Sequence, residues 1–265
     1  MRSHILWMGC IVLVYSTISS AFSPYENYLL SGRPTHVGLI AQATENKEDD
    51  LANALLEIAS DQHTDAFAQA GITNISSYAK KIHGATWFVV YFTFDGTKEY
   101  LDAAEAFESV PVVTALKPAL VPHPRAVRYG RQWLQMEWIN FIRGKNVERQ
   151  ATSKLMIVTR IRPEKEAEYR SLHQTVWPGV VDQAIRGNIR NLCIFLVEMG
   201  DDLVEFLYLE YVGDNDAADD VMNKADPINI RWWRHTDACQ IGLSGQDNWV
   251  LMDQIAERVA SNPTP

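Results

Sequence analysis

The chain has 265 residues, 47% of them hydrophobic and 22% charged, which is enough apolar material for one large or two ordinary globular domains. Its net charge of −9 and the lack of a Lys/Arg cluster argue against a nucleic-acid partner, because phosphate binding needs a basic surface. A soluble protein that acts on neutral or cationic small molecules fits this charge better.

The first 21 residues are typical of an export signal. Arg2 precedes an apolar run from Ile5 to Tyr15, and small residues at Ser19 and Ala21 fit a cleavage site after Ala21. The run is short for a membrane span, so we expect no stable membrane insertion, with an anchor formed by residues 5–21 as the alternative. The sequence therefore predicts an exported protein, periplasmic or secreted if the signal is cleaved.

Removal of the signal would leave two cysteines, Cys193 and Cys239. One bridge between them is possible in an exported protein. Both lie in apolar stretches, where buried thiols are common, and we favour free thiols.

The same series of elements appears twice along the chain. In the first half the patterns predict strands at 36–44, 72–80, 86–94 and 131–142, and helices at 47–70 and 97–110. In the second half they predict strands at 155–161, 190–197 and 203–212, helices at 163–186 and 216–225, and a last stretch to 259. The helix at 163–186 is interrupted near Trp177-Pro178, because the residue before proline avoids helical geometry.

Each half therefore has the order strand, helix, strand, strand, helix, strand, which is the ferredoxin-like order. The sequence predicts an α+β fold with one ferredoxin-like domain at residues 36–143 and a second at 154–259. A four-stranded antiparallel sheet with helices on one face leaves its other face apolar, and two copies can bury these faces against each other. We expect an intrachain pseudo-dimer, that is, a dimeric α/β barrel made from one chain, and further oligomerisation stays open.

Tyr169, His173 and Trp177 are spaced four apart, so on a helix they line one side. They supply a hydroxyl, a group that titrates near neutral pH and a flat apolar surface, which a cleft for a small polyol needs. We expect Trp232 and Trp233 to face them across one pocket. The alternative is that these residues only pack an amphipathic helix. The first half has neither His nor aromatic residues at the matching positions, so only the second half is expected to carry a site.

Several separated residues of the second half resemble one known family. Glu168-Tyr169, His173 and Val176-Trp177-Pro178 resemble the signature of the sugar mutarotases that include L-rhamnose and L-fucose mutarotases. Asp226 with Arg231-Trp232-Trp233 resembles the rhamnose branch, and Phe206 and Glu210 fit the same frame. The resemblance covers residues 155–255, while the first half shares only the outline of the fold.

The resemblance implies an isomerase that interconverts the α and β anomers of a free 6-deoxy sugar such as L-rhamnose, without metal or cofactor. It implies that His173 is the proton donor and that Tyr169, Trp232 and Trp233 contact the sugar. Leu192 departs from the family pattern, because the rhamnose enzymes have a sugar-contacting Tyr there. Export is a second departure, since these enzymes usually serve cytoplasmic sugar catabolism. The identity of the sugar therefore stays open.

Anomer exchange needs a group that gives and takes protons, and an imidazole with a pKa of about 6.5 suits this at physiological pH. Glu210 is the candidate for a second proton-handling group, with an outward-facing solvated position as the alternative. Trp177 is either a wall of the pocket or a core plug before the kink. No metal site is predicted, because metal-ligand spacing is lacking among His36, His63, His83, His123 and His235.

Two other functions remain compatible with the sequence. One is a catalytically silent monosaccharide-binding module that has kept the pocket and lost the chemistry. The other is an enzyme that transforms a small, for example aromatic, molecule on the same dimeric α/β-barrel fold.

Overall fold

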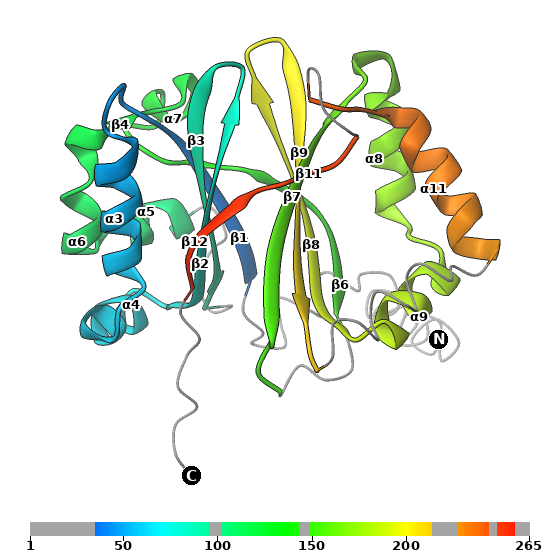
Figure 1. Ribbon diagram of the computed structural model, residues 1–265, viewed down its shortest axis with the longest axis horizontal. Helices are drawn as coiled ribbons and strands as arrows, with labels where there is room; N and C mark the ends of the chain where they lie inside the picture. Colours follow the sequence, from blue (N-terminus) through cyan, green and yellow to red (C-terminus); the bar gives the residue numbers. More distant parts are fainter. Residues whose placement is uncertain (1–34, 96–101, 144–148, 214–226, 244–247, 258–265) are drawn as a thin grey trace, which may run out of the picture.

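The computed structural model describes residues 35–95, 102–143, 149–213, 227–243 and 248–257. Two antiparallel sheets stand face to face, and helices cover the outer face of each, giving the layers helix, sheet, sheet, helix (Figure 1). The export signal and Asp226 lie outside the described residues. Within them, no helix is both long and apolar enough to cross a membrane.

The first sheet contains the long strands β1 (Thr35–Ala43), β2 (Ile72–Ile82) and β3 (Ala85–Phe94), and the short strands β4 (Leu120–Val121) and β5 (Leu134–Gln135). Its helices are α3 (Glu48–Ile58), α4 (Thr64–Gln69), α5 (Ala103–Ser109), α6 (Pro111–Thr114) and α7 (Pro124–Val127). The single helix predicted at 47–70 is divided into α3 and α4, because Ser60 has an extended backbone.

The second sheet contains β6 (Glu137–Arg143), β7 (Ser153–Ile161), β8 (Ile189–Met199), β9 (Asp202–Tyr211), β10 (Gln240–Ile241) and β11 (Val250–Leu251). Its helices are α8 (Glu166–Gln174), α9 (Pro178–Arg186) and α11 (Pro227–Cys239). The predicted interruption near Trp177-Pro178 is present, since α8 ends at Gln174 and α9 begins at Pro178.

The strand orders are β4-β1-β3-β2-β12 and β10-β7-β9-β8-β6, where β12 is Asp253–Glu257. Each sheet therefore has the ferredoxin-like core, in which the first strand lies between the fourth and the third. The predicted α+β fold with two ferredoxin-like halves is confirmed.

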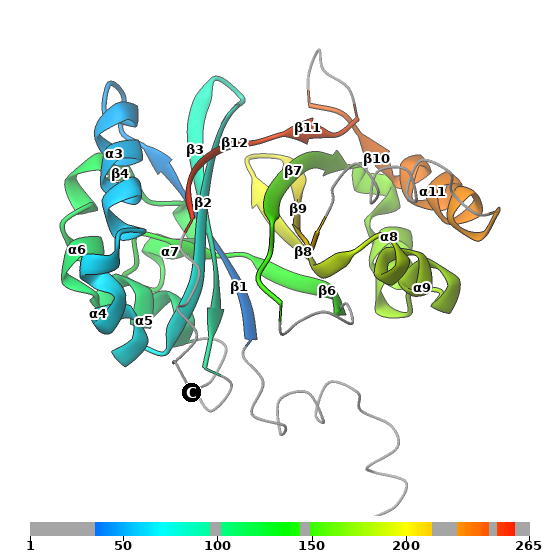
Figure 2. The ribbon, with the colours of Figure 1, turned by 60° about the horizontal axis from the view of Figure 1, so that its bottom comes forward.

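Each half also gives its last strand to the other sheet. β6, which was expected to close the first half, pairs with β8 of the second sheet, and β12 pairs with β2 of the first. The chain leaves the first sheet at Met136, whose amide donates a hydrogen bond to the Gly38 carbonyl at 2.8 Å. In Figure 2 both exchanged strands cross from one half to the other. A boundary at residue 143 therefore assigns a strand of the second sheet to the first half.

Side chains alternate between the two faces of a strand, so each sheet has one face toward its helices and one toward the other sheet. Between the sheets lies an apolar core that includes Ile40, Val89, Met156, Phe195 and Phe206. Gly38 of β1 leaves room for Met136 and for the Phe195 ring of β8, because a Cβ there would lie 2.6 Å from the Met136 Cε and 3.2 Å from the Phe195 Cγ.

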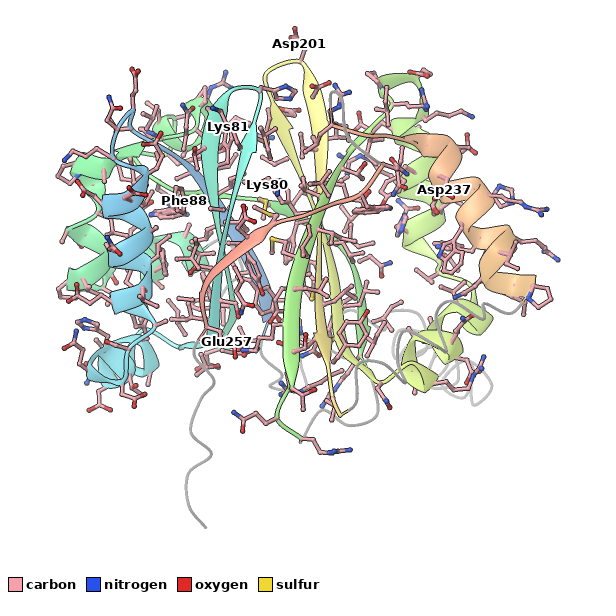
Figure 3. All side chains as sticks on the ribbon, viewed as in Figure 1. Lys80, Lys81, Phe88, Asp201, Asp237 and Glu257 are labelled. Carbon is pink, nitrogen blue, oxygen red and sulfur yellow. The ribbon has the colours of Figure 1, made fainter. Side chains whose placement is uncertain are left out.

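The layer between the first sheet and its helices is filled by aromatic rings. Phe92 stacks on Phe107 with ring centroids 5.5 Å apart, and Trp133 meets Phe107 edge-on at 5.7 Å. Phe88, labelled in Figure 3, belongs to the same buried cluster. In this half the layer holds a buried hydrophobic cluster, whereas the corresponding layer of the second half contains the cavity described below.

Glu210 is the centre of a buried polar cluster between the sheets. Its carboxylate accepts hydrogen bonds at 2.5–3.0 Å from Asn74, Tyr208, Arg190 and Asn191. Lys154 donates to the Asn74 side-chain oxygen at 2.8 Å, and its pKa is lowered by burial. Because Asn74 belongs to β2 and the other members to the second sheet, the cluster joins the two halves.

We predict that Glu210→Gln lowers the free energy of unfolding by about 3–5 kcal/mol, because it leaves buried cations without their counter-charge. Glu198→Gln is the matched control. Its carboxylate meets Arg125 at 3.3 Å on the surface, and such exposed pairs contribute about 0–1 kcal/mol. Urea denaturation measures both losses, and equal small losses would contradict the assigned role of Glu210.

Candidate active site

A cavity of about 270 Å³ lies between the second sheet and its helices. Strands β7, β8 and β9 form its floor, and α8, α9 and α11 cover it. Asp237 of α11, labelled in Figure 3, lines the cavity and is exposed, so the cavity opens to solvent near this residue.

His173 lines the cavity from the last turn of α8 and is buried. Its Nδ1 lies 3.0 Å from the Tyr169 carbonyl oxygen. A carbonyl oxygen only accepts, so Nδ1 carries the hydrogen and Nε2 is left as the acceptor. Burial lowers the pKa of His173 below its ordinary 6.5. The imidazole is therefore neutral at neutral pH and can accept a proton.

Glu205 of β9 also lines the cavity and is almost completely buried. The Tyr169 hydroxyl donates a short hydrogen bond to its Oε1, and the Gln240 amide donates to Oε2 at 3.0 Å. Burial raises the pKa of Glu205 to about 8, because the two neutral donors replace only part of the lost hydration. The carboxyl group therefore keeps its proton at neutral pH.

Tyr169 stands between these two groups. Its ring centroid lies 4.2 Å from that of His173, and its hydroxyl reaches Glu205. Burial raises the pKa of Tyr169 well above 10, and the Glu205 charge adds to this. The hydroxyl thus stays protonated. It can donate a hydrogen bond to Glu205 and accept one from an occupant of the cavity.

Trp232 and Trp233 of α11 belong to the aromatic lining, together with Tyr211 and Trp249, which the sequence patterns did not single out. Trp232 is buried and meets His173 edge-on at 5.4 Å, whereas Trp233 is half-buried. The structure thus brings Tyr169, His173, Trp232 and Trp233 to one cavity. Leu192 lines the same cavity, so this wall lacks the hydroxyl that the family pattern implies.

Trp177, predicted as a wall of the pocket, does not line the cavity. Its ring packs against Trp232 at 5.4 Å and His235 at 5.7 Å, with the Arg231 guanidinium over it. The four-residue spacing fails here because α8 has already ended at Gln174. Trp177 is therefore a packing residue behind the site.

Glu210, predicted as the second proton-handling group, also lies outside the cavity. It faces the other sheet, so neither the pocket nor the solvated position expected for it is correct. The acidic group in the cavity is Glu205, five residues earlier, and an odd spacing along a strand puts two side chains on opposite faces. Glu205 is visible in the sequence as an acidic residue of the same predicted strand, but the sequence does not reveal which face of β9 meets the helices.

Other reactive groups do not add to the site. Cys193 and Cys239 are both buried, with no disulfide between them. Among the residues that the structure describes, no group of three or more His, Cys, Asp or Glu side chains is arranged to hold a metal ion.

Comparison with known proteins agrees with the resemblance noted in the sequence. Residues 154–257 match the sequence pattern of the L-rhamnose mutarotase family. No curated protein sequence matches the chain. The resemblance of the second half to this family, noted in the sequence, is thus confirmed over residues 154–257.

One solved structure with a TM-score of 0.50 shares the fold, and a second is similar at a lower score. A candidate monooxygenase from Fusobacterium nucleatum subsp. nucleatum has a TM-score of 0.50 and 9% identity, over 86% of this chain and 95% of its own. A candidate monooxygenase from Lactobacillus acidophilus has a TM-score of 0.46 and 9% identity, over 86% of this chain and 96% of its own. At this identity the similarity concerns the fold alone.

The raised pKa of Glu205 predicts a specific pH dependence of stability. The folded chain binds this proton more tightly than the unfolded chain, where the pKa is near 4.5. The contribution to stability is therefore complete below pH 4.5 and is lost as the pH rises through about 8.

We predict that the stability of the wild type, relative to Glu205→Gln, falls between pH 5 and 8 by on the order of 1 kcal/mol per pH unit. Urea denaturation of both proteins across this range measures the difference. A difference that stays constant with pH would mean that Glu205 is ionised in the folded protein at pH 5.

Proposed function

We propose that this protein is an aldose mutarotase, which exchanges the α and β anomers of a 6-deoxy sugar such as L-rhamnose at the cavity of its second half. One observation carries the proposal: a neutral imidazole and a protonated carboxyl face the same cavity, with their pKa values moved in opposite directions by burial. Paired groups of this kind are what acid–base catalysis near pH 7 requires.

In the proposed reaction, His173 Nε2 accepts the proton of the anomeric hydroxyl. The Glu205 proton passes to the ring oxygen, and the bond between C1 and the ring oxygen breaks. The open-chain aldehyde then rotates about the bond between C1 and C2. On closure the former ring oxygen attacks the other face of C1 and returns its proton to Glu205, while the imidazolium protonates the new anomeric oxygen.

The remaining contacts fit this reaction. Trp232 and Trp233 offer flat apolar faces on which the C–H side of a pyranose can stack. The family match covers the half that contains the cavity. In the forward direction His173 acts as the base, and on closure it is the proton donor that the family resemblance implies.

We predict that His173→Ala slows anomer exchange on L-rhamnose by about 10²–10⁴-fold, the usual contribution of a positioned proton-transfer group. Saturation-transfer NMR measures the exchange, with the uncatalysed rate subtracted. His235→Ala is the matched control, because this exposed histidine of α11 packs on Trp177 outside the cavity and should leave the rate unchanged. Equal rates for wild type and His173→Ala would leave a binding module without catalysis.

The pH dependence of the exchange rate tests the role of Glu205 separately from that of His173. We predict that the rate falls as the pH rises through about 8, because Glu205 loses the proton that it must donate. In Glu205→Gln this alkaline fall should disappear and the rate at neutral pH should drop. An unchanged alkaline fall in the variant would remove Glu205 from the reaction.

A further inference from the structure

The polarity of the cavity floor changes along β9. Glu205 lies opposite Thr159 of β7 and Leu196 of β8. Two residues further on, Leu207 lies opposite Ile157 and Ile194. The floor is therefore polar at its Glu205 end and apolar one step later.

The apolar character continues beyond this step. Leu209 lies opposite Leu192, which in turn lies opposite Ile142 of the exchanged strand β6. From Glu205 to Leu209 the strand covers about 13 Å at roughly 3.3 Å per residue. Tyr211 marks the far end of the cavity floor along β9 and is itself buried.

The residues that cover the floor are also polar at the Glu205 end and mostly apolar at the other end. Tyr169 and His173 of α8, and Gln240 just after α11, gather at Glu205. Over the other end, Val180 and Ala184 of α9 line the cavity, and Ala184 packs in one cluster with Leu209 and Ile142. The polar side chains Asn140, Asn229 and Thr236 also line the cavity, and Asn140 of β6 lies opposite Ile194, so the apolar end has one polar residue at its edge.

A free monosaccharide matches only one end of this cavity. Its hydroxyl groups surround the ring, and those turned toward Leu192, Leu207 and Leu209 would exchange their hydration for contact with hydrocarbon side chains. A buried hydroxyl without a hydrogen bond costs about 1–3 kcal/mol, whereas burying apolar surface there is favourable. The apolar end is suited to an alkyl or acyl group.

We propose that the substrate of this site is an amphiphilic cyclic hemiacetal: a deoxy-sugar ring with a free anomeric hydroxyl, bearing an apolar chain. This inference rests on the proposed function and specifies its substrate. The anomeric carbon lies at His173 and Glu205, where the proton transfers occur. A substituent on the opposite side of the ring, at C4, extends along Leu207 and Leu209 toward Ala184.

The test compares L-rhamnose with its 4-O-ethyl, 4-O-butyl and 4-O-hexyl ethers, all of which keep a free anomeric centre. We expect kcat/KM for anomer exchange to rise along the series, by up to about fourfold for each methylene that is buried. The same order is expected for affinities measured by calorimetry. Values that are flat or falling from L-rhamnose to the hexyl ether would overturn the inference.

A variant tests where the chain lies. Leu192→Gln should reduce the ratio of kcat/KM for the hexyl ether to kcat/KM for L-rhamnose at least tenfold, because one apolar wall becomes polar. Leu172→Gln is the control, since this half-buried leucine of α8 lies outside the cavity and should keep the preference. A preference that survives Leu192→Gln would contradict the assigned path. If either variant fails to fold, the ether series on the wild type still decides.

The two proposals can fail separately. Calorimetric binding that strengthens along the ether series without any exchange would support the amphiphilic ligand and refute the mutarotase. Exchange on L-rhamnose without any gain from the ethers would support the mutarotase and refute the amphiphilic substrate.

Discussion

The site depends on the alternation of side chains along β9. Glu205, Leu207 and Leu209 face the helices, whereas Tyr208 and Glu210 face the other sheet. Two buried glutamates of the same strand therefore have opposite environments. Glu210 accepts hydrogen bonds from Arg190 and neighbouring amides, which hold the two halves together. Among the described residues, Glu205 accepts hydrogen bonds from the neutral donors Tyr169 and Gln240 beside a cavity, and burial there favours its protonated form.

The two halves share a fold but differ in one layer. Between the first sheet and its helices, rings such as Phe92, Phe107 and Trp133 fill the space, while the equivalent layer of the second half is hollow. The first half still contributes to the site, because the exchanged strand β6 supplies Asn140 and Ile142 to the cavity wall. The first half thus supplies both the facing sheet and a part of the cavity wall.

The sequence was sufficient for the fold and for part of the site, because these depend on local spacing. Strand and helix order gave the two ferredoxin-like halves, and the His173, Tyr169 and Trp232 pattern identified residues that meet in one cavity. The sequence was insufficient where the position of a side chain depends on which face of a strand meets the helices, or on where a helix ends. To choose Glu205 rather than Glu210, one must know which face of β9 meets the helices. Trp177 lies outside the cavity because α8 ends at Gln174. The exchange of β6 and β12 depends on contacts between the halves that local patterns do not encode.

The most direct test is a titration of the Glu205 side-chain carboxyl by ¹³C NMR, with the resonance assigned by its loss in Glu205→Gln. The account predicts that this carbon titrates near pH 8, which would mean that the cavity holds a proton donor at neutral pH. A midpoint near the ordinary value of 4.5 would show an ionised carboxylate in the cavity, and the cavity would then lack the proton donor that the proposed reaction needs.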